Sequence, residues 1–171
     1  MRLFDGFHKI DEVTDPEGNK RERLVLKSAV GAFVVDSRGR VCLVRQYRPA
    51  VGHETWEIPA GVLDKGFSKE QTIYEELLEE CHLRFPEGAI THENITEDYY
   101  MIPGSSDATM TIYTLHHKGV GEYSPITDDN DVLEVKWFTI PEILAKIASG
   151  NIKDPKTIIA TYKFELSSVY E

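Results

Sequence analysis

The chain has 171 residues, 41% of them hydrophobic and 28% charged, and carries a formal net charge of -10. This length fits one domain with a well-filled core and is too short for two ordinary domains. The acidic balance argues against nucleic-acid binding, because neutralising phosphates requires clustered lysine and arginine. No apolar run is long enough to span a bilayer, and the N-terminal residues are unlike a signal peptide, so we expect a cytoplasmic protein.

The N-terminal third of the chain predicts two β-hairpins. Two short apolar runs within residues 1–27 flank the turn sequence DPEG at residues 15–18, and this hairpin is expected to project from the body. Residues 24–36 and 41–47 are rich in β-forming residues and are separated by the turn sequence SRGR, which predicts the second hairpin. A short strand over residues 54–60 then leads to Gly61.

A helix with a run of glutamates in its second half is expected next. Ser68 and Gln71 form a capping-box start, and apolar residues recur at helical spacing over residues 73–81. The helix therefore begins near Ser68. Its second half carries Glu75, Glu76, Glu79 and Glu80.

These glutamates permit two interpretations. A charge run is commonly a solvated helix face. This run contains no lysine or arginine, however, and each like-charge pair at i,i+4 costs roughly 0.2–0.5 kcal/mol. A hard divalent cation would turn that repulsion into ligation, and oxygen ligands suit magnesium, manganese or calcium rather than zinc. We expect Glu76 and Glu80, with Glu79 beside them, to converge on such a metal opposite the apolar face.

The second half of the chain adds strands and then helices. Residues 97–102 and 109–117 predict strands around a loop, and residues 132–138 predict another strand. One helix is expected to start near Pro141 and a second at Asp154 and Pro155. Strands with a helix in mid-chain and two at the end predict an α/β fold, in which a mixed sheet has helices on both faces.

Several residues outside the helix remain open to two interpretations. Strand alternation puts Asp131 on the same face as Leu133, where it is either a metal ligand or a cap that ends the loop. Glu134 falls on the opposite, surface face. Arg45 and Arg48 either grip a diphosphate with their planar donor groups or pair with surface acids. The two cysteines, Cys42 and Cys81, both lie in apolar patterns and are expected to be buried, reduced thiols.

The segment from Gly61 to Leu83 resembles the Nudix box. Gly61 matches its first glycine, Glu76 the glutamate after the arginine, and Glu79 and Glu80 the paired glutamates. Leu77 and Leu83 match the aliphatic positions. Three residues depart from the pattern: Phe67 replaces the first glutamate, Glu75 the arginine, and His82 the closing glycine. The closing glycine suits a left-handed helix end, so His82 either takes that conformation with modest strain or shifts the end of the helix.

Two further segments, residues 45–61 and 99–108, resemble the ADP-ribose and nucleotide-sugar pyrophosphatase branch of the Nudix superfamily. The resemblance covers nearly the whole chain and implies a single Nudix-type α/β/α sandwich over residues 1–171. It implies Mg²⁺ or Mn²⁺ held by the Ala60 carbonyl, Glu76 and Glu80. It also implies catalytic roles for Glu79, Asp129 and Asp131, and substrate contacts from Arg45, Arg48, Glu57 and Gly104.

The expected function is metal-dependent hydrolysis of a nucleoside diphosphate linked to another group. The branch points to ADP-ribose or a nucleotide sugar, cleaved to AMP and a sugar phosphate. The alternative, motivated by Phe67 and Glu75, is a degenerate Nudix domain that binds nucleotides or regulates without turnover. Members of the branch are typically dimers, and we expect a homodimer with residues 1–27 as the dimerisation element.

Overall fold

A mixed seven-stranded sheet forms the centre of the computed structural model, which describes residues 1–5, 9–119, 121 and 132–170. Strands follow the order β10-β5-β4-β9-β8, with β6 paired to β5 and β7 to β4. β4 and β9 run parallel, and the other pairs are antiparallel. The bounds are β4 Ala29–Val35, β5 Arg40–Arg48, β6 His53–Glu57, β7 Ala60–Val62, β8 Ile95–Tyr100, β9 Thr109–His116 and β10 Val132–Thr139.

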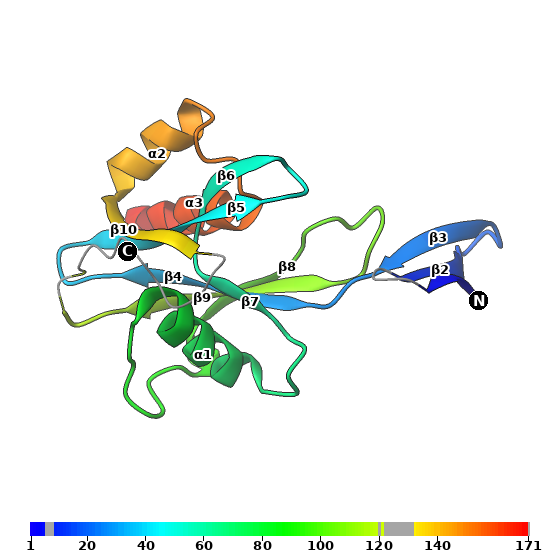
Figure 1. Ribbon diagram of the computed structural model, residues 1–171, viewed down its shortest axis with the longest axis horizontal. Coiled ribbons are helices and arrows are strands. Elements are labelled where there is room, and N and C mark those ends of the chain that lie inside the picture. The colour runs from blue at the N-terminus through cyan, green and yellow to red at the C-terminus, as the bar shows by residue number, and fades with distance from the viewer. Residues whose placement is uncertain (6–8, 120, 122–131, 171) are drawn as a thin grey trace.

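Helices cover both faces of this sheet, as predicted. Helix α1 (Lys69–Cys81) packs on one face, while α2 (Ile140–Ala148) and α3 (Pro155–Tyr170) lie on the other (Figure 1). A short 3₁₀ helix, η1 (His92–Asn94), precedes β8. Side chains alternate along each strand, so the sheet separates two core clusters. Ile73, Leu77 and Tyr113 belong to the cluster under α1, and Phe33, Ile143 and Ile152 to the cluster under α2 and α3.

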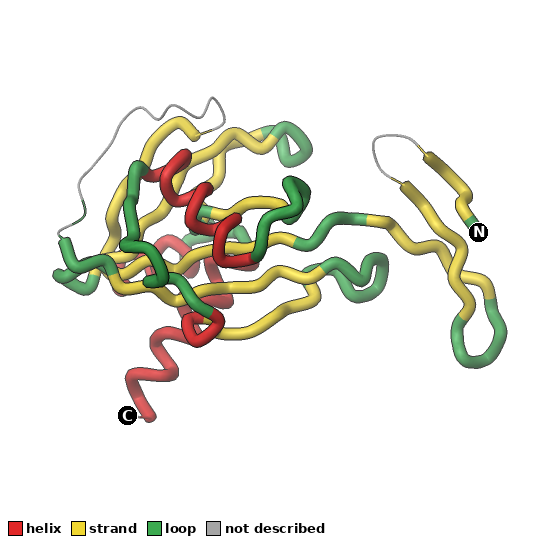
Figure 2. Tube along the Cα trace, turned by 90° about the horizontal axis from the view of Figure 1, so that it is seen from below, coloured by secondary structure: helices red, strands yellow, loops and turns green. Residues whose placement is uncertain are grey.

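The N-terminal hairpin is confirmed and is joined by a further strand. β2 (Lys9–Thr14) and β3 (Lys20–Val25) pair around the predicted turn, and β1 (Arg2–Asp5) adds to β2. This three-stranded sheet projects away from the central body (Figures 1 and 2). It is tied to the loop after β8 by the Arg23–Asp107 ion pair, with 2.7 Å between Nη1 and Oδ2, and by Leu24 N donating to the Ser105 carbonyl.

Helix α1 begins where the sequence predicts, and its end follows the first of the two alternatives for His82. The Ser68 hydroxyl accepts a hydrogen bond from Gln71 N at 3.1 Å and caps the first turn. His82 ends the helix with φ of 55° and ψ of 24°, the left-handed conformation that glycine takes more readily. Its backbone N–H and that of Leu83 bond to the carbonyls of the last turn. Among the described residues, His82 is the only one besides glycine with positive φ.

The interpretation of β10 by simple alternation is wrong at its first residues. Leu133 is 38% exposed, whereas Val132 is buried, because the pairing with β5 shifts register between Val132 and Glu134. Glu134, expected at the surface, is half-buried and accepts from Arg45 Nε at 2.7 Å. Asp129 and Asp131 lie outside the described residues.

The two cysteines are buried free thiols, as expected. Their Sγ atoms lie 3.8 Å apart, between β5 and α1. The contact with Cys42, together with burial, raises the pKa of the Cys81 thiol. No helix within the described part of the chain is long and apolar enough to cross a membrane.

Candidate functional site

The candidate site contains a close contact between the backbone of Gly61 and the side chain of Glu76. β7 pairs with β4, Gly61 opposite Val30, and this pairing fixes the Gly61 backbone beneath α1. A Cβ atom on Gly61 would lie 2.3 Å from Cγ, Cδ and Oε1 of Glu76, closer than any ordinary contact. The Glu76 carboxylate therefore rests directly on the backbone of Gly61, next to Ala60. Only glycine at position 61 leaves room for it.

Glu80 is held at the same place from the other side. It is 3% exposed and accepts hydrogen bonds from Gln46 Nε2 at 2.7 Å and from Ala60 N at 3.2 Å. This position corrects the expectation that the three carboxylates lie opposite the apolar face. Glu80 faces the sheet because Gln46 on β5 and the backbone of β7 supply donors to a carboxylate that is otherwise costly to bury.

Both carboxylates line one open pocket of about 270 Å³. The structure thus brings together Ala60, Glu76, Glu80 and Arg48 of the predicted set. Glu79 is not among the lining residues. Its side chain is 52% exposed and lies 3.7 Å from Lys65 Nζ, in the loop between β7 and α1. The other lining residues are Gln46, Gly61, Val62, Asp64 and Lys65.

The oxygen atoms available in this pocket are ligands that suit a hard divalent cation. Two carboxylates meet at the backbone of residues 60 and 61, and all the available ligand atoms are oxygens. Within the described residues, no group of three or more His, Cys, Asp and Glu side chains is arranged for a metal. Two carboxylates and one carbonyl match magnesium, which keeps water and substrate oxygens in its remaining positions.

Arg48 borders the pocket and is held by Glu57. Its Nε and Nη2 donate to the two oxygens of Glu57 at 2.8 and 2.7 Å. Glu57 also accepts from Thr55 and from Lys156, a buried lysine on α3. Burial opposes ionisation of Glu57, but the hydrogen bonds from Arg48 and the charge of Lys156 lower its pKa to about 2. Glu57 is therefore a permanent anion that orients Arg48.

Arg45 does not border the pocket that Glu76 and Glu80 line. It forms ion pairs with Glu54 and Glu134 and lies 6.0 Å from the ring of Trp56. The structure therefore places it in the pairing role that the sequence left open as the alternative. The hydrogen bond that Arg45 donates to Glu54 and, to a lesser extent, the one that it donates to Glu134 raise the pKa of Arg45.

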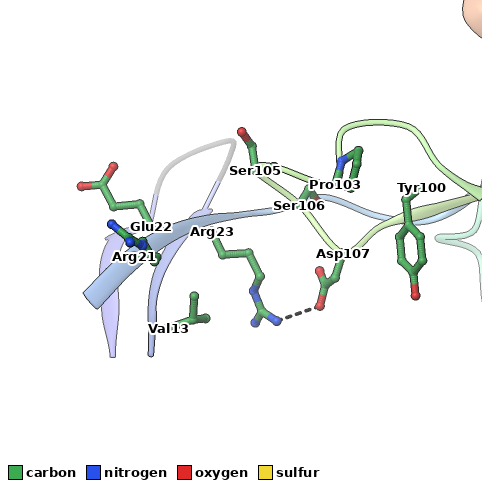
Figure 3. A pocket seen from close by; sticks show the side chains of 10 residues that line it. Val13, Arg21, Glu22, Arg23, Tyr100, Pro103, Ser105, Ser106 and Asp107 are labelled. Carbon is green, nitrogen blue, oxygen red and sulfur yellow. Dashed lines mark hydrogen bonds and ion pairs between the residues drawn. The ribbon is translucent and has the colours of Figure 1, made fainter. Parts of the chain in front are cut away.

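Gly104 lines a second pocket. Residues of the N-terminal sheet and of the loop after β8 surround this pocket (Figure 3). This pocket also contains Tyr100 and the Arg23–Asp107 ion pair, and Arg21 and Glu22 line it from β3. None of the residues that line it also lines the pocket of Glu76 and Glu80. The structure of one chain therefore does not bring Gly104 together with the acidic site.

Two residues that depart from the box pattern also lie apart from the acidic pocket. Phe67 is 40% exposed in the loop before α1. Glu75 lines a different pocket, with Tyr74, Gln71 and Pro86. Neither residue occupies the space around Glu76 and Glu80.

Comparisons with known proteins match the chain to one family model and to several relatives. The NUDIX domain family model matches residues 25–159. The ADP-ribose pyrophosphatase of Bacillus subtilis (strain 168) is 27% identical over 166 residues, which cover 95% of this chain and 86% of that protein. The ADP-ribose pyrophosphatase of Mycobacterium tuberculosis (strain ATCC 25618 / H37Rv) is 31% identical over 146 residues, covering 83% and 68%. The methanol dehydrogenase activator of Bacillus methanolicus is 26% identical over 160 residues, covering 92% and 84%.

Proposed function

Because the chain belongs to the NUDIX domain family and is a Nudix pyrophosphohydrolase, we propose that its substrate is ADP-ribose or a nucleotide sugar. The products from ADP-ribose are AMP and ribose 5-phosphate. The observation that carries this proposal is the meeting of Glu76 and Glu80 at the Ala60–Gly61 backbone, with Arg48 at the edge of the same pocket. Both relatives named ADP-ribose pyrophosphatase align over most of this chain.

The cofactor we propose is Mg²⁺ or Mn²⁺, held by the Ala60 carbonyl, Glu76 and Glu80. When bound, it screens the diphosphate and lowers the pKa of a coordinated water. Gln46 and Ala60 N fix the Glu80 carboxylate, so that this ligand is oriented before the metal arrives. Arg48, held by Glu57, presents a positive charge to the diphosphate. Glu79, half exposed beside Lys65 of the pocket lining, acts from the edge of the site, and Asp129 or Asp131 takes the proton from water.

A substrate panel tests this function. With magnesium or manganese, the purified protein is expected to release phosphatase-sensitive products from ADP-ribose or from a nucleotide sugar. Dinucleoside polyphosphates and nucleoside triphosphates serve as comparison substrates. Activity confined to dinucleoside polyphosphates and nucleoside triphosphates would refute the substrate assignment. Silence across the whole panel would favour a nucleotide-binding or regulatory module instead.

Substitution of the ligand glutamates tests the site. We expect Glu76→Gln and Glu80→Gln each to lower turnover about 100-fold or more, because each removes a charge that holds the metal. Folding is retained, since each change also relieves like-charge repulsion in the helix. Glu87→Gln, an exposed change in the loop after α1, is the matched control and keeps wild-type turnover. Near-normal turnover of either ligand variant would show that the metal lies elsewhere.

We further propose that residues 1–171 form one domain and that residues 1–27 join two copies in a homodimer. The β1-β2-β3 sheet projects from the body, and a lone three-stranded sheet leaves its faces without a core of their own (Figure 2). Light scattering is expected to give a dimer at micromolar concentration. A monomer that remains fully active after deletion of residues 1–20 would refute this proposal.

We also propose that the protein works in the cytoplasm. Cys42 and Cys81 are free thiols whose Sγ atoms lie 3.8 Å apart. Thiols this close persist in a reducing compartment, whereas an oxidising one favours their pairing. When the protein is denatured in fresh cell lysate, we expect a thiol reagent to label both cysteines. Recovery of an oxidised pair would argue against this location.

A further inference from the structure

The first turn of α3 is fastened to the segment that leads into the acidic pocket. Thr157 Oγ1 accepts a hydrogen bond from Ile58 N at 2.8 Å, and Lys156 Nζ donates to Glu57 Oε2. Asp154 caps the helix by accepting from Thr157 N at 3.0 Å. Lys156 and Thr157 of α3 therefore hold Glu57 and Ile58, which precede Ala60 and Gly61 by three positions. The C-terminal helix is thus connected to the site although it lies on the opposite face of the sheet from α1 (Figure 1).

Lys156 occupies a place that disfavours a lysine in two ways. Its side chain is only 8% exposed, so its ammonium group loses most of its hydration. It also lies in the first turn of a 16-residue helix, where a positive charge opposes the helix dipole. Ion pairs with Glu57 and with Asp154, at 2.9 Å for the latter, offset these costs. The local helix does not require a lysine here, so its role lies with the partners it contacts.

The partner that leads to the pocket is Glu57. Its single negative charge is shared between Lys156 and Arg48, and both of its oxygens accept from Arg48. Since Lys156 neutralises part of that charge, Arg48 keeps more of its own positive charge for an anion in the pocket. The Arg48 side chain uses Nε and Nη2 on Glu57 and makes no other hydrogen bond to the residues that the structure describes. Its remaining N–H groups are left for the diphosphate.

We propose that Lys156 is a positioning residue that acts on substrate through Glu57 and Arg48. It fixes the Glu57 carboxylate in the orientation that Arg48 requires and keeps Arg48 electrostatically available. Lys156 itself does not touch the substrate. This inference rests on the proposed function, because it assumes that Arg48 binds the diphosphate.

Kinetics on two backgrounds test the proposal. We expect Lys156→Met to raise the KM for ADP-ribose about tenfold with kcat changed less than about twofold, since a contact to the bound diphosphate acts on ground state and transition state alike. In the Glu57→Gln background, the same change is expected to alter KM less than about twofold, because its route to Arg48 is already broken. Lys163→Met is the matched control. It removes an exposed lysine of the same helix that pairs with Glu97, and its KM stays at the wild-type value.

A tenfold rise in KM in both backgrounds would overturn the proposal, because Lys156 would then act without Glu57. A folded Lys156→Met variant with unchanged KM would also overturn it. If Lys156→Met alone does not fold, KM is compared between Glu57→Gln and the double variant, since neither carries the uncompensated Glu57 charge. A tenfold difference in KM between these two variants overturns the proposal. Calorimetric titration with inorganic pyrophosphate and magnesium is run on each variant. The Kd for pyrophosphate is expected to change between variants as KM does. If the wild type is inactive on ADP-ribose, the proposed substrate is refuted, and these Kd values still test the role of Lys156.

Discussion

Replacing Gly61 by alanine offers the most direct test of the site geometry. The new Cβ would lie 2.3 Å from three atoms of Glu76, whereas ordinary contacts begin near 3.4 Å. The carboxylate must therefore retreat by about 1 Å, and misplacement on that scale is expected to lower turnover roughly 100-fold. Stability changes little, because the atoms that move are the end of a flexible side chain. We expect the free energy of unfolding to stay within about 1 kcal/mol of wild type.

The assay compares turnover on ADP-ribose with urea unfolding for Gly61→Ala and for a matched control, Gly31→Ala. Gly31 lies on β4 opposite Ala60. Its Cβ would lie 3.2 Å from the flexible end of Ile58 and 3.6 Å from Ala60 Cβ and Met110 Sδ, so its three nearest neighbours include no carboxylate. Its turnover is expected within about threefold of wild type. If Gly61→Ala kept comparable turnover, the position of Glu76 against the backbone would be irrelevant to catalysis. The assignment of Glu76 as a metal ligand would then be wrong.

Three further changes follow from the same structure. Glu75→Arg turns the like-charge i,i+4 pair with Glu79 into an attractive one, so thermal unfolding should show a gain of about 0.5 kcal/mol in the free energy of unfolding. Turnover should rise several-fold, and a fall in turnover would mean that Glu75 is itself a ligand. His82→Gly removes the cost of a left-handed residue at φ 55°, and we expect urea unfolding to give a gain of about 0.5–1 kcal/mol, whereas His82→Ala gives none. The pKa of Glu57 is lowered from 4.5 to about 2, so it stabilises the fold above pH 4.5 and loses that contribution as the pH falls toward 2. Glu57→Gln should therefore flatten the decline in stability across this window, by roughly 2–3 kcal/mol, and an unchanged decline would place the acid sensitivity elsewhere.

The fold was predictable where the signals are local. The DPEG and SRGR turns, the Ser68 cap and the Asp154–Pro155 helix start each depend on a few neighbouring residues, and the structure places elements as these signals predict. His82 belongs to the same class, because the left-handed end of a helix is set within one turn. Local backbone chemistry therefore gave most of the element boundaries without any tertiary information.

Prediction failed where a partner far along the chain decides the outcome. Glu80 is buried because Gln46 donates to it, and 34 residues separate the two. Leu133 is exposed because pairing with β5 shifts register, which alternation within β10 alone does not reveal. Lys156 escaped notice because Glu57 lies 99 positions away. One sequence signal was available for it, namely a lysine in the first turn of a helix, where the dipole disfavours positive charge.

The acidic run on α1 resolves into two stripes with different roles. Glu76 and Glu80, one turn apart, face β7 and share a pocket, whereas Glu79 is half exposed toward Lys65 and Glu75 lines a separate surface. The solvated-face interpretation therefore fits the second stripe, and the ligand role that we propose falls on the first. Neighbouring helix residues differ by about 100°, so each of the two glutamate pairs contributes one residue to each stripe. The stripe at β7 combines mutual repulsion with burial of Glu80, two unfavourable terms that a divalent cation would reverse.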